Sequence, residues 1–518
     1  MGANYKRMRP LNYLISPDSI EAQEKNHSIC IALYNAALNN DWKAAEKIIS
    51  ADTRVKTAAI TKLEETILHV AVGAQNVEFV EKLLKLLSDE DVLLQDSREN
   101  TAFSYAAASG NVMIAQLLMR KNEGLPFIRG GEGVSPLYLA ASFGRAQMAS
   151  FLYPKTIHIL QVGERKGLFL QCINFGIYDL ALKMFKEDIS LVRARDLSNN
   201  TALHILAGRP KAFPEQNKYN WMKNLIKSSN NDDHHDHMNE SSNEALKLVR
   251  ELWRETLNNK DENCFRQIID TPSKLLFDAT ESGNFMFLFE LIRVCPDLLI
   301  ERNEDDQTIF HVAALKGHKR IFNLIHEIGF KKDIITSMED KFGNNLLHLA
   351  GTFVASSHEY DYGMRQILQL RQEFEWFKEV KKVVEPYYIE KKNSEGLTAQ
   401  DLFNKTHKTL FGDVEDWIKS TSSLCMTLST IIIIGIFIVY FNNNNGPIIS
   451  GRVSSPLLIS SLFASTISLI TFSCTLITTS WYGNNMDTLI LLFIVGIAAL
   501  FVSVMTMVVS CARKFTQV

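Results

Sequence analysis

One short block of residues recurs along the first 350 positions of this chain. Each block closes on a small side chain, at Ala36, Ala71, Ala106, Ala140, Cys172, Ala207, Ala279, Ala313 and Ala350. Neighbouring members lie 32 to 37 residues apart, except for one interval of 72 residues that holds an insertion. A fixed period in this range is typical of solenoids, in which each repeat is one small structural unit.

The blocks share apolar residues; four of the six begin with a threonine, and four carry a histidine three residues after the first position. They begin at Thr66, Thr101, Ser135, Thr201, Thr308 and Asn345, and the first reads Thr-Ile-Leu-His-Val-Ala. This pattern resembles the TPLHxA element of ankyrin repeats, which are helix pairs joined by short hairpins. The threonine is expected to cap the first helix of each pair. The resemblance implies that His69, His204, His311 and His348 form hydrogen bonds between adjacent repeats.

Two further repeating patterns also indicate an all-α fold of helix pairs. A glycine stands four residues after the aligned small residue at Gly110, Gly144, Gly176, Gly283 and Gly317. Glycine accepts the left-handed conformation that ends a helix. Loops rich in Asp and Asn precede the blocks, over 96–100, 196–200, 303–307 and 340–344. Such residues favour tight turns.

The chain is therefore expected to contain six segments. They are an N-terminal tail (1–27), a first set of repeats (28–207), an insertion (208–271), a second set of repeats (272–357), a linker helix with a last ankyrin-like cap (358–421) and a transmembrane domain (422–518). The polar run over 227–243 predicts a disordered loop inserted between repeats. A helix is expected to follow it over Glu244–Asn258.

The last fifth of the sequence is apolar. Three runs, over 422–441, 456–480 and 488–511, reach the roughly 20 residues that a membrane-spanning helix needs. From Ser422 onward the charged residues are Arg452, Asp487, Arg513 and Lys514. Many Ser, Thr, Ala and Gly residues favour close packing of these helices. Asp487 is expected to cap a helix start, rather than to act as an intramembrane charge.

The stretch from Ile367 to about Thr421 resembles the linker of plant ankyrin-repeat membrane proteins that carry a C-terminal PGG domain. Accelerated-cell-death and salt-tolerance proteins belong to that family. The resemblance implies signalling in defence, cell death or stress, at the plasma membrane. Two features depart from it. The Pro-Gly-Gly triplet is absent from the loop over 442–451, and relatives usually carry four membrane helices where three are expected here.

We interpret the chain as a membrane-bound adaptor and not as an enzyme. Stacked repeats present an elongated surface to other proteins, and the net charge of -3 gives no support for nucleic-acid binding. Partner contacts are expected at hairpin tips, including Arg98, Asn100, Asn199 and Asp306. The repeats should face the cytosol, because the N-terminus lacks the apolar core of a signal peptide. An ion channel built by a homo-oligomer of the membrane helices remains the alternative function.

Three other features receive ordinary structural interpretations. The cluster over 232–237, with two Asp–His pairs, has the ligand types of a metal site and resembles the DHHC motif, but a solvated loop is expected. Gly130–Gly133 lacks the GK[ST] ending of a phosphate loop and is expected to be a hairpin. Glu373, Glu375 and Glu379 alternate with lysines, which predicts a solvated helix face. No metal or cofactor is expected.

Overall fold

The computed structural model describes residues 8–12, 20–213, 243–258, 266, 269–270, 274–353, 363–443, 455–478 and 486–515. The chain divides into two compact units, Met1–Leu299 and Ile300–Val518. Both are built from helices, so the predicted all-α fold is confirmed. Two-residue strands, β1 (Leu11–Asn12) and β2 (Ala58–Ala59), pair in parallel within the first unit.

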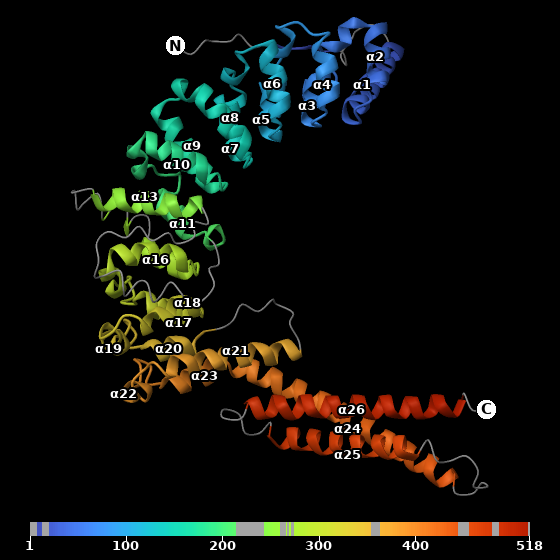
Figure 1. The fold of residues 1–518 in the computed structure, drawn as a ribbon, viewed down its shortest axis with the longest axis vertical. Helices are drawn as coiled ribbons and strands as arrows, with labels where there is room; N and C mark the ends of the chain where they lie inside the picture. The colour runs from blue at the N-terminus through green and yellow to red at the C-terminus, as the bar shows by residue number, and fades with distance from the viewer. Residues whose placement is uncertain are drawn as a thin grey trace, which may run out of the picture. The chain divides into compact units, whose positions relative to one another are not determined.

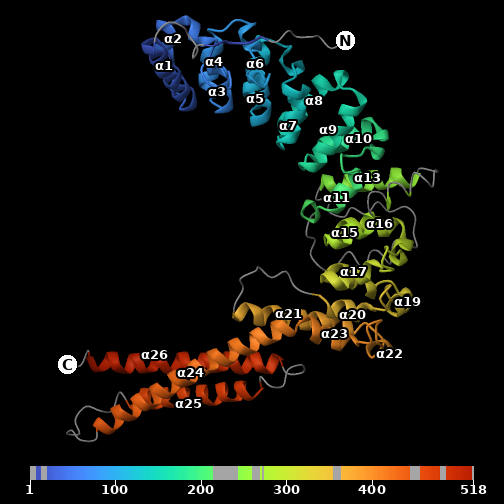
Figure 2. The same cartoon turned by 180° about the vertical axis from the view of Figure 1, so that it is seen from behind.

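The first unit is a row of helix pairs (Figures 1 and 2). Its helices are α1 (Ile20–Leu38), α2 (Trp42–Ala51), α3 (Ile67–Gly73), α4 (Val77–Leu84), α5 (Ala102–Ser109), α6 (Val112–Lys121), α7 (Pro136–Ser142), α8 (Ala146–Thr156), α9 (Val162–Asn174), α10 (Tyr178–Glu187), α11 (Ala202–Ala207), α13 (Glu244–Asn258), α15 (Leu275–Glu281) and α16 (Phe285–Val294). The first helices of successive pairs pack on one another, as do the second helices.

Small side chains explain how closely the first helices pack. Ala71, Ala106, Ala140 and Cys172 are fully buried where α3, α5, α7 and α9 contact one another. Second helices begin at side-chain caps: Asp41, Asn111 and Asn284 each accept a hydrogen bond from the backbone N–H three residues on. The sequence thus sets both the helix starts and the helix–helix distance.

Helix α13 has the bounds predicted for it, but its role differs from the expectation. It packs on α11, and also between the second helices α10 and α16. The guanidinium of Arg250 donates to both carboxylate oxygens of the buried Glu290 on α16, at 3.0 and 2.7 Å. Helix α13 is therefore the second helix of the pair that α11 begins, and the insertion interrupts one repeat instead of separating two. The polar run itself lies mostly outside the described residues.

The second unit continues with helix pairs and ends in long apolar helices. Its helices are α17 (Ile309–Lys316), α18 (Lys319–Phe322), α19 (Lys331–Ser337), α20 (Leu346–Gly351), α21 (Met364–Lys381), α22 (Pro386–Ile389), α23 (Ala399–Thr406), α24 (Lys408–Asn443), α25 (Ser455–Thr478) and α26 (Met486–Phe515). The first helices α17, α20 and α23 stack in order, and α21 packs beside α20.

Short 3-10 segments connect these helices in both units. They are η1 (Thr53–Lys56), η2 (Asp91–Leu93), η3 (Leu125–Phe127), η4 (Gly131–Gly133), η5 (Ile157–Ile159), η6 (Ile189–Arg193), η7 (Pro210–Ala212), η8 (Pro296–Ile300) and η9 (Asn323–His326). The glycine-rich run at Gly130–Gly133 contains η4, and the Gly131 N–H donates to the Arg98 carbonyl at 2.7 Å. Its backbone therefore joins neighbouring hairpins of the stack.

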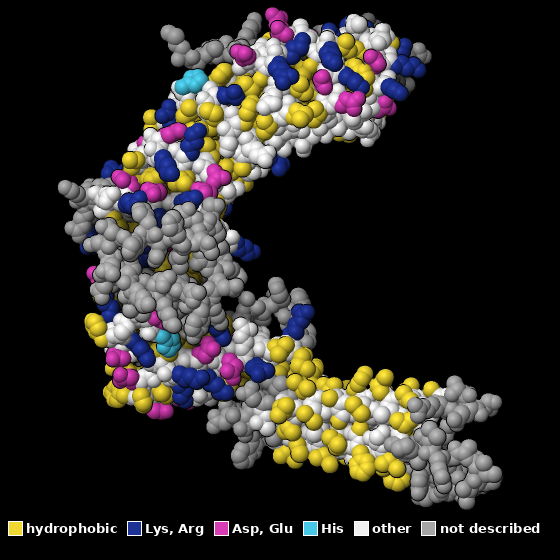
Figure 3. Space-filling view, viewed as in Figure 1, with side chains coloured by type: hydrophobic (Ala, Val, Ile, Leu, Met, Phe, Trp, Pro, Cys, Tyr) yellow, Lys and Arg dark blue, Asp and Glu magenta, His cyan; other side chains and the backbone are white. Residues whose placement is uncertain are grey.

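Within the described parts of the chain, three helices are long and apolar enough to cross a membrane, over Lys408–Ile438, Leu457–Ile477 and Leu491–Ser510. Helix α24 begins at Lys408 and runs unbroken for 36 residues, so the first apolar span continues a helix that starts 14 residues before Ser422. Apolar side chains cover the visible outer surface of this bundle (Figure 3). Helix α26 starts at Met486, which places Asp487 in its first turn.

Buried serines join the three apolar helices. Ser461 and Ser503 each donate to the other's backbone carbonyl, at 2.9 and 3.0 Å. Ser468 donates to the Gly496 carbonyl at 3.1 Å and accepts from Ser429 of α24. Hydrogen bonds of this kind and close approach at small residues drive helix association in lipid. The predicted packing of the membrane helices on one another is present in the structure.

Candidate partner-binding surface and membrane junction

Five hairpin turns share one backbone frame. The first side chain of each turn accepts hydrogen bonds, at 2.8 to 3.1 Å, from the backbone N–H groups two and four residues on. The five first residues are Asp96, Asp196, Asn303, Asp340 and Asn393. The fourth residue of each turn is left-handed, with φ between 59° and 77°. One acceptor side chain and one left-handed residue therefore fix the turn.

The second and third residues of these turns are exposed, and their backbones link neighbouring turns. The Ser97 N–H donates to the Leu63 carbonyl, the Lys341 N–H to the Asp305 carbonyl and the Ser394 N–H to the Phe342 carbonyl, at 2.8 to 3.1 Å. Backbone atoms thus hold the tips in a row, within each unit. Some of these side chains pair at the surface, as Lys341 does with Asp305 at 3.6 Å and Glu395 with Lys405 at 2.8 Å, but all of these positions are exposed to a partner.

The four residues proposed for partner binding occupy different places in this frame. Arg98, Asn199 and Asp306 are exposed at hairpin tips. Asn100 is half-buried: its backbone carbonyl lies 3.1 Å from His69 Nε2, and its amide lies 3.5 Å from Asp96 Oδ2. Asn100 therefore shapes the hairpin more than it presents a side chain to solvent.

Two tip residues are apolar: Leu197 lies in a tip that was expected to contact partners, and Phe342 lies in one that the sequence analysis did not single out. Leu197 is fully exposed, and 58% of the Phe342 surface is exposed, at the second and third positions of their turns. An apolar side chain within an otherwise polar turn was the available signal. Such exposed apolar groups on a polar rim are common at protein-binding surfaces.

Three of the block histidines, His69, His311 and His348, contact a backbone carbonyl of the next repeat. In His69, Nδ1 accepts from the Thr66 backbone N–H at 3.2 Å, so the proton resides on Nε2, which donates to the Asn100 carbonyl at 3.1 Å. His311 bonds in the same way to Thr308 and to the Met338 carbonyl. His348 Nε2 lies 3.1 Å from the Leu397 carbonyl. Burial lowers the pKa of His69, and that of His311 to about 4.

His204 reveals a shift in the predicted register. Its Nδ1 lies 2.8 Å from the Thr201 hydroxyl, as His69 lies from Thr66. Counting from the threonine, the position equivalent to Ala71 is Leu206, and not Ala207 as the alignment assumed. Leu206 and Ala207 are both fully buried, and this block is one residue out of phase with the small-residue pattern.

The five aligned glycines all have positive φ, from 67° to 83°. Asn40 and Gln75 occupy the same repeat position, with φ of 56° and 61°. A pattern defined by glycine alone does not include these two residues. At Gly110 an added Cβ would lie 2.8 Å from Arg145 Cδ, the middle of a flexible side chain. At Gly317 it would lie 2.4 Å from the Phe353 ring, which is buried.

We expect Gly317→Val to destabilise the second unit by at least about 1–2 kcal/mol, because a left-handed backbone rejects a branched side chain and the ring must move. Hydrogen exchange of α17 and α20 in the detergent-solubilised full chain would measure the loss. Gly163→Val is the matched control, since Gly163 has open space around its Cβ position and no positive φ. Equal protection in both variants would contradict the assigned role of Gly317.

A buried charge pair lies where the repeats meet α24. Glu373 of α21 and His407, just before α24, are both fully buried, and their Oε2 and Nε2 atoms are 3.1 Å apart. The ring's Nδ1 donates to the Phe403 carbonyl at 2.8 Å, and Nε2 also faces the Phe353 carbonyl. Because both nitrogens face acceptors, the ring is an imidazolium. The expected solvated face is therefore wrong at Glu373.

The pH dependence of the two kinds of histidine should be opposite. Burial by itself lowers the pKa of His407, but its bonds to Glu373, Phe403 and Phe353 outweigh burial and raise that pKa. The contribution of His407 to stability is present below about pH 6.5 and is lost as the pH rises through the raised pKa. The contribution of His311 to stability is present above about pH 6.5 and declines as the pH falls toward 4.

Hydrogen exchange of the full chain at several pH values, corrected for intrinsic rates, would measure this difference. Protection at α23 and the start of α24 should fall on the alkaline side. Protection at α17 should fall on the acid side. Parallel changes at both places would contradict the assigned protonation states.

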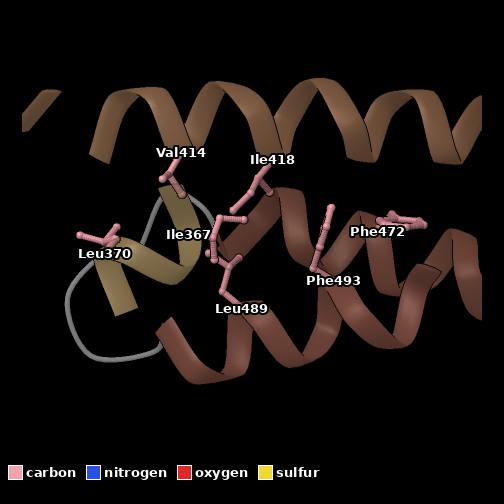
Figure 4. Close-up of a cluster of buried hydrophobic side chains, with 7 residues drawn as sticks. All are labelled: Ile367, Leu370, Val414, Ile418, Phe472, Leu489 and Phe493. Atoms are coloured by element: carbon pink, nitrogen blue, oxygen red, sulfur yellow. The ribbon is translucent and has the colours of Figure 1, made fainter. Parts of the chain in front are cut away.

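The linker helix α21 packs on the apolar helices. Ile367 and Leu370 of α21 belong to a buried cluster with Val414 and Ile418 of α24, Phe472 of α25, and Leu489 and Phe493 of α26 (Figure 4). Farther along α21, the Trp376 Nε1–H donates to the Ala314 carbonyl of α17 at 2.9 Å. Helix α21 therefore contacts a repeat helix and the membrane bundle at once.

The arrangement defines a helical-repeat protein that joins an open surface to apolar helices. The family model described as ankyrin repeats (3 copies) matches residues 11–125 and, in an overlapping match, residues 68–162. The N-terminal part of the chain consists of ankyrin repeats, a fold whose members generally serve as non-enzymatic interaction scaffolds. A search of curated proteins finds no match to this chain. Among the described residues, no cluster of His, Cys, Asp and Glu could hold a metal ion; the Asp–His cluster lies outside them.

Proposed function

We propose that the protein is a membrane-tethered adaptor whose ankyrin hairpins bind other proteins. One observation supports the proposal: in each turn, the residues that hold the backbone differ from those that face solvent. Backbone atoms and one Asp or Asn side chain hold the turn, and two neighbouring side chains are exposed. Helices α24 to α26 would hold the repeats at a bilayer. The repeats would face the cytosol, with the plasma membrane as the site and plant defence, cell-death or stress signalling as the process.

A comparison of matched variants tests the adaptor role. The full chain, the tip variant Arg98→Ala/Leu197→Ala/Phe342→Ala, which changes only second and third turn positions, and a control variant, Glu81→Ala/Lys85→Ala at the C-terminal end of α4, would be cross-linked in membranes. Proteins that bind the wild type and the control, but not the tip variant, would support hairpin binding. Equal recovery with all three chains would contradict the role assigned to these tips.

The channel alternative requires several copies of the bundle to line a pore. The buried hydroxyls of α25 and α26 instead bond across one chain's own helix interface. Planar-bilayer recording from the reconstituted full chain distinguishes the two functions. A silent bilayer is expected for the adaptor, and a unitary current would contradict it.

A further inference from the structure

The first two turns of α21 lie at the level where the membrane bundle begins. Ile367 and Leu370 belong to the same buried cluster as Leu489 and Phe493, which flank the start of the apolar span Leu491–Ser510. The rings of Trp417 and Phe493 are 5.3 Å apart, and Trp417 packs beside Gly363, immediately before α21. Tryptophan is typical of the membrane–water interface. If the bundle spans a bilayer, this end of α21 therefore lies at its surface.

The outer face of the same two turns combines apolar and basic side chains. Leu368 and Met364 are 53% and 38% exposed. Arg365 and Arg371, both exposed, stand three residues before and three residues after Leu368, so they flank it on adjoining turns. The sequence over 364–371 carries two arginines and no acidic residue. Figure 3 shows basic and apolar side chains meeting where Figure 1 places this end of α21.

We propose that residues 364–371 form an interfacial segment that binds anionic phospholipid headgroups. Leu368 and Met364 would enter the boundary between headgroups and acyl chains, while the two guanidinium groups contact lipid phosphates. The membrane surface is the expected occupant because the inner side of α21 is continuous with the bundle core. Basic side chains also match the negative charge of the cytoplasmic leaflet. The inference rests on the proposed membrane anchoring.

Acidic groups near residues 364–371 weaken the attraction for anionic lipid and restrict it to this segment. Asp413 of α24 faces α21 and accepts from Gln366 Nε2 at 3.4 Å, and Asp416 is exposed on the same helix. Glu375, one turn beyond Arg371, pairs with Lys378 at 3.6 Å. The basic segment thus ends within two turns, which predicts a local lipid contact instead of a broad basic surface.

Photo-crosslinking in nanodiscs tests the position of the segment. Benzoylphenylalanine would replace Leu368, Ile467 on the outer face of α25, or Gln400 on the exposed side of α23, in the full chain. Lipid adducts are expected at positions 368 and 467 but not at 400. An adduct at 467 without one at 368 would overturn the interfacial segment alone. Absence of an adduct at 467 would instead overturn the membrane anchoring on which it rests.

Native mass spectrometry tests the choice of lipid. Nanodiscs of phosphatidylglycerol and phosphatidylcholine would be compared for the wild type, Arg365→Gln/Arg371→Gln and the control Lys381→Gln/Lys382→Gln, which removes equal charge from the other end of α21. The arginine variant should lower the ratio of bound phosphatidylglycerol to phosphatidylcholine at least about fivefold, and the control should leave it unchanged. An unchanged ratio in the arginine variant would overturn the proposal.

Discussion

Replacing Glu373 by leucine should destabilise the second unit by about 3–5 kcal/mol, the usual effect of breaking a buried ion pair. The variant leaves the His407 imidazolium buried without its counter-charge, although two backbone carbonyls still face its nitrogens. The ring can avoid this only by losing a proton and one hydrogen bond. Unfolding of the detergent-solubilised full chain, followed by hydrogen exchange at α21 and α23, would measure the loss.

Glu375→Gln is the matched control for this experiment. Glu375 lies two residues away on the same helix, is half-exposed, and pairs with Lys378 three residues on. Surface pairs of this kind contribute about 0–1 kcal/mol, so the control should unfold almost as the wild type does. If the two substitutions had equal effects, the buried pair would not stabilise the junction.

Replacing Trp376 by alanine should also be severe, with a loss of about 3–5 kcal/mol from the cavity alone. Its indole is fully buried, its ring meets that of Phe322 edge-on with centroids 5.2 Å apart, and its N–H donates to the Ala314 carbonyl at 2.9 Å. The change should raise exchange at α17 and α18 as well as at α21, because the indole joins these helices.

Tyr387→Ala removes a comparable aromatic ring that is 74% exposed, and it should have little effect on exchange in the same helices. A loss confined to α21 in the Trp376 variant would show that the helix is anchored to the repeats by other contacts.

The repeat period and the turn residues predicted most of the fold. Helix α13 has the bounds expected from the sequence, and the aligned glycines have the left-handed geometry that glycine adopts easily. These features are local, because caps, left-handed residues and helical periodicity depend on a few neighbouring positions. The sequence therefore predicted where helices begin and end better than it predicted what they contact.

The misassigned roles of Glu373 and α13 depend on contacts between distant residues. Glu373 has the same local pattern as Glu375, and only the position of His407, 34 residues later, makes it a buried partner. The role of α13 as the second helix of an interrupted repeat follows from its packing on α10 and α16. The apolar Phe342 interrupts an otherwise polar turn, and the structure shows that 58% of its surface is exposed.

The shared turn frame has a consequence for how such a protein can diversify. Because conformation is held by the first and fourth residues, exchanges at the second and third positions leave the scaffold's hydrogen bonds in place. Substitutions that change partner recognition and substitutions that change folding then fall at different positions of the turn. A lineage could acquire a new binding preference by a few substitutions at the loop ends, without compensating changes in the helices beneath.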